Sequence, residues 1–356
     1  MENNNYIPDY KVALEIKDKL DIFLLNKINF LEAKQHNDFT KLNYWIVFNK
    51  YIYEFEKMYN KDLSMFNEEE VKNIIKSRVT KQIDTLAYLK SVINTYEEWA
   101  LEVGLNPTYN PCQGWDVKDV AIINKDKVKE EYVTIDDLFD SWERTKKDAN
   151  NNLSYQEFAT VLLARVGVKG EKWNELKFLK LTDIDFDKGV INVTNRESED
   201  QSNIEVVKKI EVEKRILEVL AKAEKETFKN VKKNKGIQIV EFVESDYLIK
   251  SIDTRNISNI HLRSNIVNFF KEIKEKYIAG KDLFRCAEID ALLEIKERNG
   301  RLNNGDFKDV VQRFELKDPS VIYLRLKDRY INVTDDKRID KLNIYRYNKN
   351  GSRRHE

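Results

Sequence analysis

The chain contains few of the residues that build metal, redox or disulfide scaffolds. It has two cysteines, Cys112 and Cys286, which lie far apart without metal-ligand spacing, and three histidines among 356 residues. These counts exclude a disulfide framework and a zinc centre as the basis of the fold. No run approaches about 18 apolar residues, and the N-terminal residues lack an apolar signal segment. We therefore expect a cytoplasmic protein with no membrane span, no metal and no cofactor.

The chain also lacks an excess of either charge. Lysine and arginine total 62, and aspartate and glutamate total 62. A nucleic-acid partner is therefore not indicated by global charge, and any such surface must come from local clusters of basic residues. The hydrophobic fraction of 41% is large enough for real cores, and the length favours two domains.

Proline is scarce as well, and its positions predict the domain organisation. Two of the four prolines, Pro107 and Pro111, interrupt an otherwise helical pattern, which is typical of a domain boundary. We predict an N-terminal helical domain over residues 1–107, a linker over 108–132, a second domain over 133–332 and a basic tail over 333–356.

Local signals place helices in both domains and a few strands in the second. Asn67 with Glu70 predicts a capping box, and Thr134 and Ser154 predict N-caps. Two extended segments, 184–194 and 204–212, are predicted to pair, and residues 237–249 add another extended piece. The lysine-rich segment 222–235 is interpreted as a solvated helix end or, alternatively, as a DNA contact. The expected fold is mainly α with a small antiparallel β-sheet.

The segment from Gly167 to Asp185 carries the most specific motif. Its Glu175-Leu176 pair, Leu179 and the closing Asp183-Ile184-Asp185 resemble the helix-to-strand box of tyrosine recombinases, the phage integrase family. The resemblance implies an N-terminal helical core-binding domain that clamps DNA and a catalytic-type domain after it. In that family an arginine three residues before the glutamate grips the scissile phosphate, and here that position is Lys172.

The remaining catalytic positions of the family are also altered. The hairpin lysine position falls near Arg196, and the His-x-x-Arg box falls at Lys281 to Arg285. There the histidine would be Lys281 or Asp282, and Arg285 would keep the second arginine. A competing candidate, His261-Leu262-Arg263, has the wrong internal spacing.

The C-terminal part of the same pattern has one match and one loss. Tyr323 is in register for the nucleophile, with Tyr330 as the alternative, whereas Phe314 stands where a histidine belongs. A lysine is a flexible point charge, so it replaces a guanidinium fork poorly. A phenol without its electrostatic donors is a weak nucleophile. We therefore expect a degenerate active site with no catalytic residues.

Among recombinase-like families, the chain is most similar to the integrase-like master repressors of SPβ-type Bacillus prophages. This resemblance implies a sequence-specific repressor that maintains lysogeny by binding double-stranded DNA at repeated operator sites in the bacterial nucleoid. Self-association or phage regulatory proteins are further expected partners. Gly167, Glu175 and Asp183 are expected to be structural. The expected DNA contacts are Lys172, Arg196, Lys208, Lys209, Arg285, Arg325, Lys327, Arg346, Arg353 and Arg354.

Two other functions remain open at this point. The first is an active, divergent tyrosine recombinase that uses Tyr323 as nucleophile. The second is an interaction module that binds another protein and no DNA. The basic tail, in which tyrosines alternate with lysines and arginines, suits either phosphate contacts or assembly with a neighbouring subunit.

Overall fold

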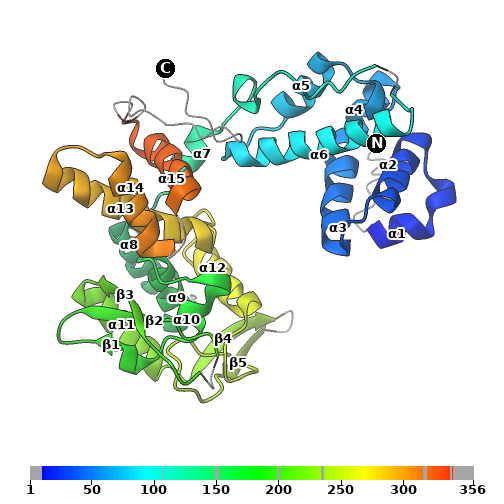
Figure 1. The fold of residues 1–356 in the computed structure, drawn as a ribbon. Coiled ribbons are helices and arrows are strands. Elements are labelled where there is room, and N and C mark those ends of the chain that lie inside the picture. Colours follow the sequence, from blue (N-terminus) through cyan, green and yellow to red (C-terminus); the bar gives the residue numbers. More distant parts are fainter. Residues whose placement is uncertain are drawn as a thin grey trace. The chain divides into compact units, whose positions relative to one another are not determined.

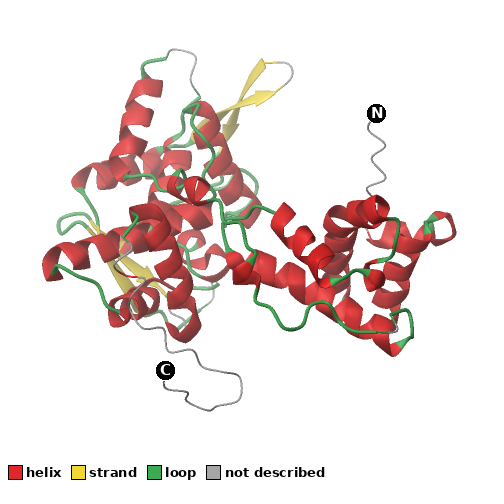
Figure 2. Ribbon diagram, turned by 90° about the horizontal axis from the view of Figure 1, so that it is seen from above, coloured by secondary structure: helices red, strands yellow, loops and turns green. Residues whose placement is uncertain are grey.

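The computed structural model describes residues 10–106, 108–148, 152–198, 201–233, 236–315, 319–336 and 339. The chain forms two compact units that divide between Lys125 and Asp126. Helices make up most of each unit, and the described strands all lie in the second (Figure 1, Figure 2). The prediction of a mainly α fold with a small antiparallel sheet is confirmed.

The first unit is a helical bundle around one core. Its α-helices are α1 (Tyr10–Glu15), α2 (Ile22–Ala33), α3 (Asp38–Val47), α4 (Tyr53–Tyr59), α5 (Glu68–Ser77) and α6 (Ile83–Glu102). Asn67 and Glu70 form the expected capping box at the start of α5, and Gly104 follows α6 with a φ of +77°. The ring of Phe30 lies 5.4 Å from that of Tyr96 and 5.5 Å from that of Trp99, so aromatic contacts join α2 to α6.

The segment that we expected to be a linker packs instead as part of the first unit over most of its length. Cys112 and Val117 are buried in the core of the bundle. Trp115 donates through its indole nitrogen to the carbonyl of Pro111, and the ammonium of Lys90 lies 3.9 Å from its ring centroid. The interpretation of residues 108–132 as a linker is corrected here, because its scattered apolar side chains bury area against the bundle although Pro111 and Gly114 interrupt the helical pattern.

The second unit begins with α7 (Lys125–Lys129), at the division between the units, and continues with helices around two small sheets. Its longer α-helices are α8 (Ile135–Lys146), α9 (Tyr155–Arg165), α11 (Lys214–Lys225), α12 (Asn259–Glu272), α13 (Gly280–Asn299), α14 (Asn304–Glu315) and α15 (Pro319–Thr334). The short α10 (Asn174–Lys177) lies in the recombinase-like box.

Helix α9 is the centre of this unit. Every residue from Gln156 to Arg165 is buried, and α11, α12 and α13 all contact the helix (Figure 1). Its N-terminus is capped as predicted, because Ser154 accepts a hydrogen bond from the backbone of Gln156. A helix with no exposed side is stable only when other elements surround it, so α9 organises the neighbouring helices and the loop that follows it.

The strands form one three-stranded sheet and one separate hairpin. The sheet pairs β1 (Ile184–Asp185), β2 (Val190–Thr194) and β3 (Val206–Glu211) in that order, all antiparallel. The hairpin pairs β4 (Phe228–Lys233) with β5 (Gly236–Glu241). The expected helix end over residues 222–235 is correct as far as Lys225, where α11 ends, and wrong beyond it, because residues 228–233 form strand β4 and pair with β5.

Candidate functional site

The loop between α9 and α10 wraps around the carboxylate of Glu175. Gly167 and Gly170 turn the chain with φ values of +99° and +64°. A Cβ on Gly170 would lie 2.6 Å from Cγ of Glu175, so only glycine allows the backbone to come this close. The side chain of Glu175 is 7% exposed, and it accepts a 2.9 Å hydrogen bond from the backbone of Lys169.

Lys208 reaches the same carboxylate from β3. Its Nζ donates to Oε2 of Glu175 at 2.8 Å, to the carbonyl of Gly167 at 2.8 Å and to the carbonyl of Phe314 at 3.3 Å. The side chain is only 1% exposed. Burial lowers the pKa of Lys208, and the charge of Glu175 opposes that shift without cancelling it. Lys208 thus ties the loop, the sheet and the end of α14 together.

Two phenyl rings close this centre. Phe284 of α13 and Phe314 of α14 meet edge to face at a centroid distance of 6.1 Å, and the ammonium of Lys208 lies 5.8 Å from each centroid. A Cβ on Gly167 would lie 2.4 Å from the ring of Phe314. The space beside Glu175 and Lys208 is therefore occupied by aromatic carbon.

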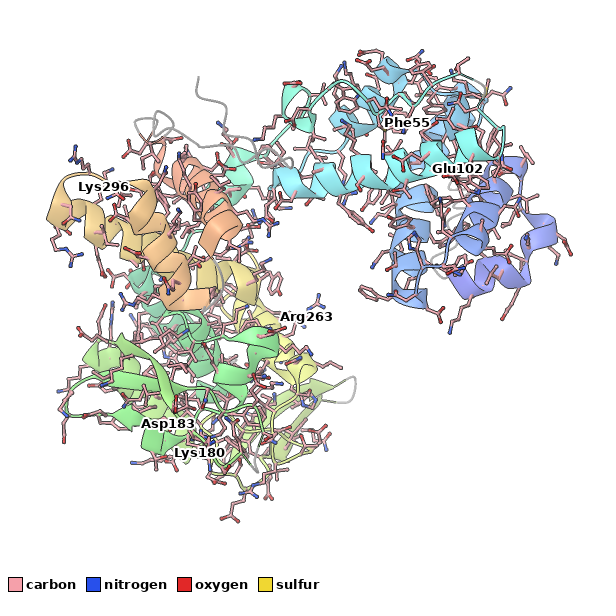
Figure 3. The ribbon with its side chains drawn as sticks, in the orientation of Figure 1. Phe55, Glu102, Lys180, Asp183, Arg263 and Lys296 are labelled. Carbon is pink, nitrogen blue, oxygen red and sulfur yellow. The ribbon has the colours of Figure 1, made fainter. Side chains whose placement is uncertain are left out.

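A second buried ion pair lies where the box enters the sheet. Arg196 donates to Oδ2 of Asp183 at 3.0 Å and to the carbonyl of Phe178 at 2.5 Å. Asp183 also accepts from the backbone of Lys180 at 2.8 Å, and both residues are labelled at this turn in Figure 3. Through these contacts Asp183 holds the turn before β1 in place.

The arginine expected in the His-x-x-Arg box is engaged with a neighbouring carboxylate. Arg285 lies 3.5 Å from Oδ1 of Asp282, and Arg329 of α15 donates to the same oxygen at 3.0 Å. All three side chains are at most 12% exposed. If Lys281 is taken as the histidine position, the arginine position becomes Phe284, whose ring faces Lys208.

The two candidate tyrosines are packed in a hydrophobic cluster formed by α13, α14 and α15. Tyr323 is 8% exposed and Tyr330 is fully buried. The ammonium of Lys308 lies 5.2 Å from the ring centroid of Tyr323. Both tyrosines thus contribute to the core of this helical layer.

The predicted DNA contacts separate into exposed and buried residues. Lys172, Lys209 and Arg325 are exposed. Burial and, as the smaller cause, the positive charge of Lys172 lower the pKa of Lys177, the last residue of α10. Arg346, Arg353 and Arg354 lie outside the described residues.

Three of the predicted contacts are corrected, and a fourth is largely enclosed. Lys208 and Arg196 are buried in ion pairs, and Lys327 is 2% exposed, so their charges serve the interior of the unit. Arg285 is 12% exposed and paired with Asp282. A phosphate contact requires a cation that reaches solvent.

Lys172 stands out among the exposed residues because of its backbone. Both Lys172 and Trp173 have positive φ, 49° and 67°, a conformation that costs free energy for residues with side chains. The ring of Trp173 holds the loop against the start of α13, where a Cβ on Gly280 would come within 2.3 Å of it. The loop therefore presents Lys172 outward from a rigid base.

Within the described residues there is no group of three or more histidine, cysteine, aspartate or glutamate side chains able to hold a metal ion. Both cysteines are buried and free. None of the helices searched among those residues is long and apolar enough to cross a membrane.

Family models match both units of this chain. The model described as the MrpR C-terminal catalytic domain matches residues 141–342, and the model of the MrpR N-terminal core-binding domain matches residues 25–102. The chain belongs to the MrpR family. The resemblance to recombinase-like proteins drawn from Glu175, Leu179 and Asp183 is confirmed by this membership.

A relative of this MrpR-family chain is the SPbeta prophage-derived uncharacterized protein YopR of Bacillus subtilis strain 168. It is 22% identical over 273 residues, which cover 74% of this chain and 79% of YopR. Among solved structures, the Tn1549 transposon integrase in complex with circular intermediate DNA covers 85% of this chain and 94% of its own, at 13% identity and a TM-score of 0.48. A lambda integrase dimer bound to a COC′ core site covers 90% and 81%, at 11% identity and a TM-score of 0.47.

Sequence reasoning missed three residues of this MrpR-family site. Lys169 carries the backbone donor to Glu175, and its ammonium lies 5.1 Å from the ring centroid of Phe284. Phe284 could have been found from one register of the His-x-x-Arg box. Arg329 has no sequence signal, because only the packing of α15 against α13 brings it to Asp282.

Proposed function

We propose that this protein is a sequence-specific, double-stranded-DNA-binding transcriptional repressor that maintains prophage lysogeny and does not cleave DNA. The observation that carries the proposal is the centre at Glu175. There, Lys208 is enclosed by one carboxylate, two backbone carbonyls and two phenyl rings. A recombinase must seat a phosphate among several cationic donors at this position, and transition-state charge stabilisation is the largest catalytic contribution.

The residues at the other catalytic positions of the family also support a protein that does not cleave DNA. Lys172 offers a single ammonium where the family uses a guanidinium, and Arg285 is paired with Asp282. Phe314 supplies no donor, and Tyr323 packs in an apolar layer. Each missing donor costs on the order of a hundredfold in rate, so several together leave little cleavage activity.

DNA binding is proposed from the scaffold and from the exposed cations. The MrpR family models name a core-binding domain and a catalytic domain, and the Tn1549 and lambda integrase structures contain DNA. Lys172, Lys209 and Arg325 are exposed in the second unit and are the cations that we assign to DNA phosphates. The YopR relative is prophage-derived, which agrees with a role in a bacterial host. Repeated operators, and self-association or phage regulatory proteins as further partners, are part of the proposal.

The first experiment recovers genomic DNA on the purified full-length protein and measures mobility shifts on the recovered sites. We expect specific, repeated sites and an affinity that falls steeply between roughly 50 and 200 mM salt. Lys172→Gln and Lys209→Gln should each weaken binding and reduce the salt slope by about one. Lys274→Gln removes a cation whose side chain is 82% exposed and serves as the matched control. A pull-down without enriched sites would favour the protein-interaction module instead.

The second experiment tests cleavage directly. A nicked suicide substrate built on a recovered site is incubated with the protein, and a covalent adduct is sought by denaturing electrophoresis. We expect no adduct from the wild-type chain. An adduct that disappears in Tyr323→Phe would establish the alternative, an active divergent recombinase with Tyr323 as nucleophile.

A further inference from the structure

The loop before α10 holds two consecutive residues in the left-handed region of backbone conformation. Lys172 has a φ of 49° and a ψ of 27°, and Trp173 has a φ of 67° and a ψ of 19°. A residue with a side chain rarely adopts this conformation, and it does so only where its surroundings hold it there. Side-chain contacts of the loop must therefore offset the cost of this stretch of backbone.

The ring of Trp173 makes such a contact. It packs against the hydrophobic core around α9. A Cβ built on Gly280, the first residue of α13, would lie 2.3 Å from Cη2 of Trp173 and 2.7 Å from Cδ1 of Ile266 on α12. Gly280 is buried, and only a residue without a Cβ allows the ring to come this close to the backbone of α13. The position of Trp173 is thus fixed by both helices.

The part of the loop before Lys172 is fixed separately. Glu175 accepts a 2.9 Å hydrogen bond from the backbone of Lys169, and a Cβ on Gly170 would lie 2.6 Å from Cγ of Glu175. These contacts end at Gly170, because the next two residues are exposed. The direction in which the side chain of Lys172 leaves the backbone therefore depends on the contact that follows it, the ring of Trp173.

A lysine depends more than an arginine on how its backbone is held. A guanidinium presents a rigid fork of donors to a phosphate, whereas an ammonium is a point charge on a flexible stem. A backbone that is already fixed loses less conformational freedom when the phosphate is bound. Trp173 can therefore contribute to the affinity for DNA without touching DNA.

We propose that Trp173, packed on Gly280, is a positioning residue for the contact between Lys172 and a DNA phosphate. This inference rests on the DNA-binding function proposed above. It adds that a neutral ring on the interior side of the loop sets the strength of the contact. The contact can then be weakened without removing any charge from the protein.

The first measurement uses the full-length protein without DNA. Hydrogen exchange is followed by mass spectrometry over residues 168–174. Trp173→Ala should speed exchange in this loop about tenfold or more, because the loop then opens more easily. Phe139→Ala is the matched control, because it removes another ring that is partly buried against the same core, and it should leave the loop unchanged. Unchanged exchange in Trp173→Ala overturns the proposal, whatever the protein does with DNA.

The second measurement is a mobility shift on a recovered site between roughly 50 and 200 mM salt. Trp173→Ala should weaken binding about three- to tenfold and reduce the salt slope towards that of Lys172→Gln. The double variant should bind no more weakly than Lys172→Gln alone, since both changes remove the same contact. Trp173→Phe should restore much of the affinity, because a phenyl ring still packs on Gly280. Phe139→Ala should bind as the wild type does.

The outcomes separate this inference from the proposed function. A wild-type protein that binds no DNA refutes both. If the wild type binds with a steep salt dependence and Trp173→Ala keeps the same slope, only the positioning role of Trp173 is refuted. The same holds if the losses of Trp173→Ala and Lys172→Gln add in the double variant.

Discussion

Two lysines, one in each unit, are buried to a similar degree but have pKa values shifted in opposite directions. Lys27 of α2 lies 2.5 Å from Oε1 of Glu56 and 3.0 Å from Oδ2 of Asp62, with its ammonium 4.2 Å from the ring centroid of Tyr96. Lys208 of β3 has one carboxylate, Glu175, and otherwise carbonyl oxygens and phenyl rings. Burial lowers the pKa of both, yet the charges of Glu56 and Asp62 raise that of Lys27 above its ordinary value, whereas the pKa of Lys208 stays lowered.

The two lysines differ in the charges that surround them. Glu56 and Asp62 more than offset the desolvation of Lys27, whereas Glu175 and Glu288 do not offset that of Lys208, whose pKa is lowered further by the charge of Lys169. The less compensated lysine contacts Glu175 of the recombinase-like box. The pKa of the buried lysine in the first unit is therefore raised, whereas that of the buried lysine at the candidate site is lowered.

The largest effect is expected from removing the better compensated lysine. Lys27→Met leaves Glu56 and Asp62 buried without their cation, and should lower the free energy of unfolding of the first unit by about 4 kcal/mol. Urea titration monitored by hydrogen-exchange mass spectrometry over α2 measures this. Lys34→Met, which breaks a pair with the largely exposed Glu102, should cost less than about 1 kcal/mol. Equal losses in the two variants would contradict the comparison.

Removing the buried lysine of the second unit, Lys208, should lower the free energy of unfolding somewhat less. Lys208→Met should lower the free energy of unfolding by about 3 kcal/mol, because Glu175 keeps the backbone donor of Lys169. The double variant Lys208→Met with Glu175→Leu should recover at least about half of that loss, since no buried charge remains. Urea unfolding followed over β3 gives both values. Additive losses in the double variant would show that the pair itself contributes little.

A substitution at Gly167, whose carbonyl accepts a hydrogen bond from Lys208, should lower the free energy of unfolding nearly as much. Gly167→Ala requires a positive φ and places a Cβ 2.4 Å from the ring of Phe314, so we expect a loss of about 2–3 kcal/mol. Gly300→Ala, at a φ of +72° with no atom within 4 Å of the added Cβ, should lose only about 1 kcal/mol. The difference between the two midpoints in urea isolates the contact with Phe314, and identical midpoints would refute its importance.

The smallest effect concerns a carboxyl near Lys27 that has no cation of its own. Burial raises the pKa of Glu97 to about 8, from an ordinary value of 4.5. A raised carboxyl pKa favours the protonated native state, so its stabilising contribution is complete below about pH 4.5 and is lost as the pH rises to about 8.

Between pH 6 and pH 9 the first unit should therefore lose roughly 2 kcal/mol. Glu97→Gln should flatten this dependence, because the amide mimics the protonated carboxyl and keeps an oxygen for the hydrogen bond from Asn106. Denaturant unfolding at both pH values measures it. An unchanged slope in the variant would assign the pH dependence to other groups.

Much of the fold was predictable because its signals are local. The capping residues Asn67, Thr134 and Ser154 each accept from a backbone nitrogen two or three residues later, which depends on sequence spacing alone. The recombinase-like box could likewise be identified from Glu175, Leu179 and Asp183. Strand β4 was not, because its pairing with β5 competes with a helical pattern in a lysine-rich segment.

The candidate site was less predictable because burial decides the role of a cation. Lys208 and Lys209 are neighbours in the sequence and were assigned the same phosphate-binding role. Lys208 pairs with Val193, which is buried, and Lys209 pairs with Asn192, which faces the other side of the sheet. One step along the strand therefore places one lysine in the core and the other in solvent.

Capping, periodicity and a compact motif act over a few residues, so the helical class, the helix starts and the family could be identified from the sequence alone. The buried ion pairs of Lys208 and Arg196, and the two rings, Phe284 and Phe314, that fill the space beside Glu175, became evident only in the folded chain. These outcomes depend on strand register and on helices distant in the chain, where desolvation and charge pairing set the role of each side chain.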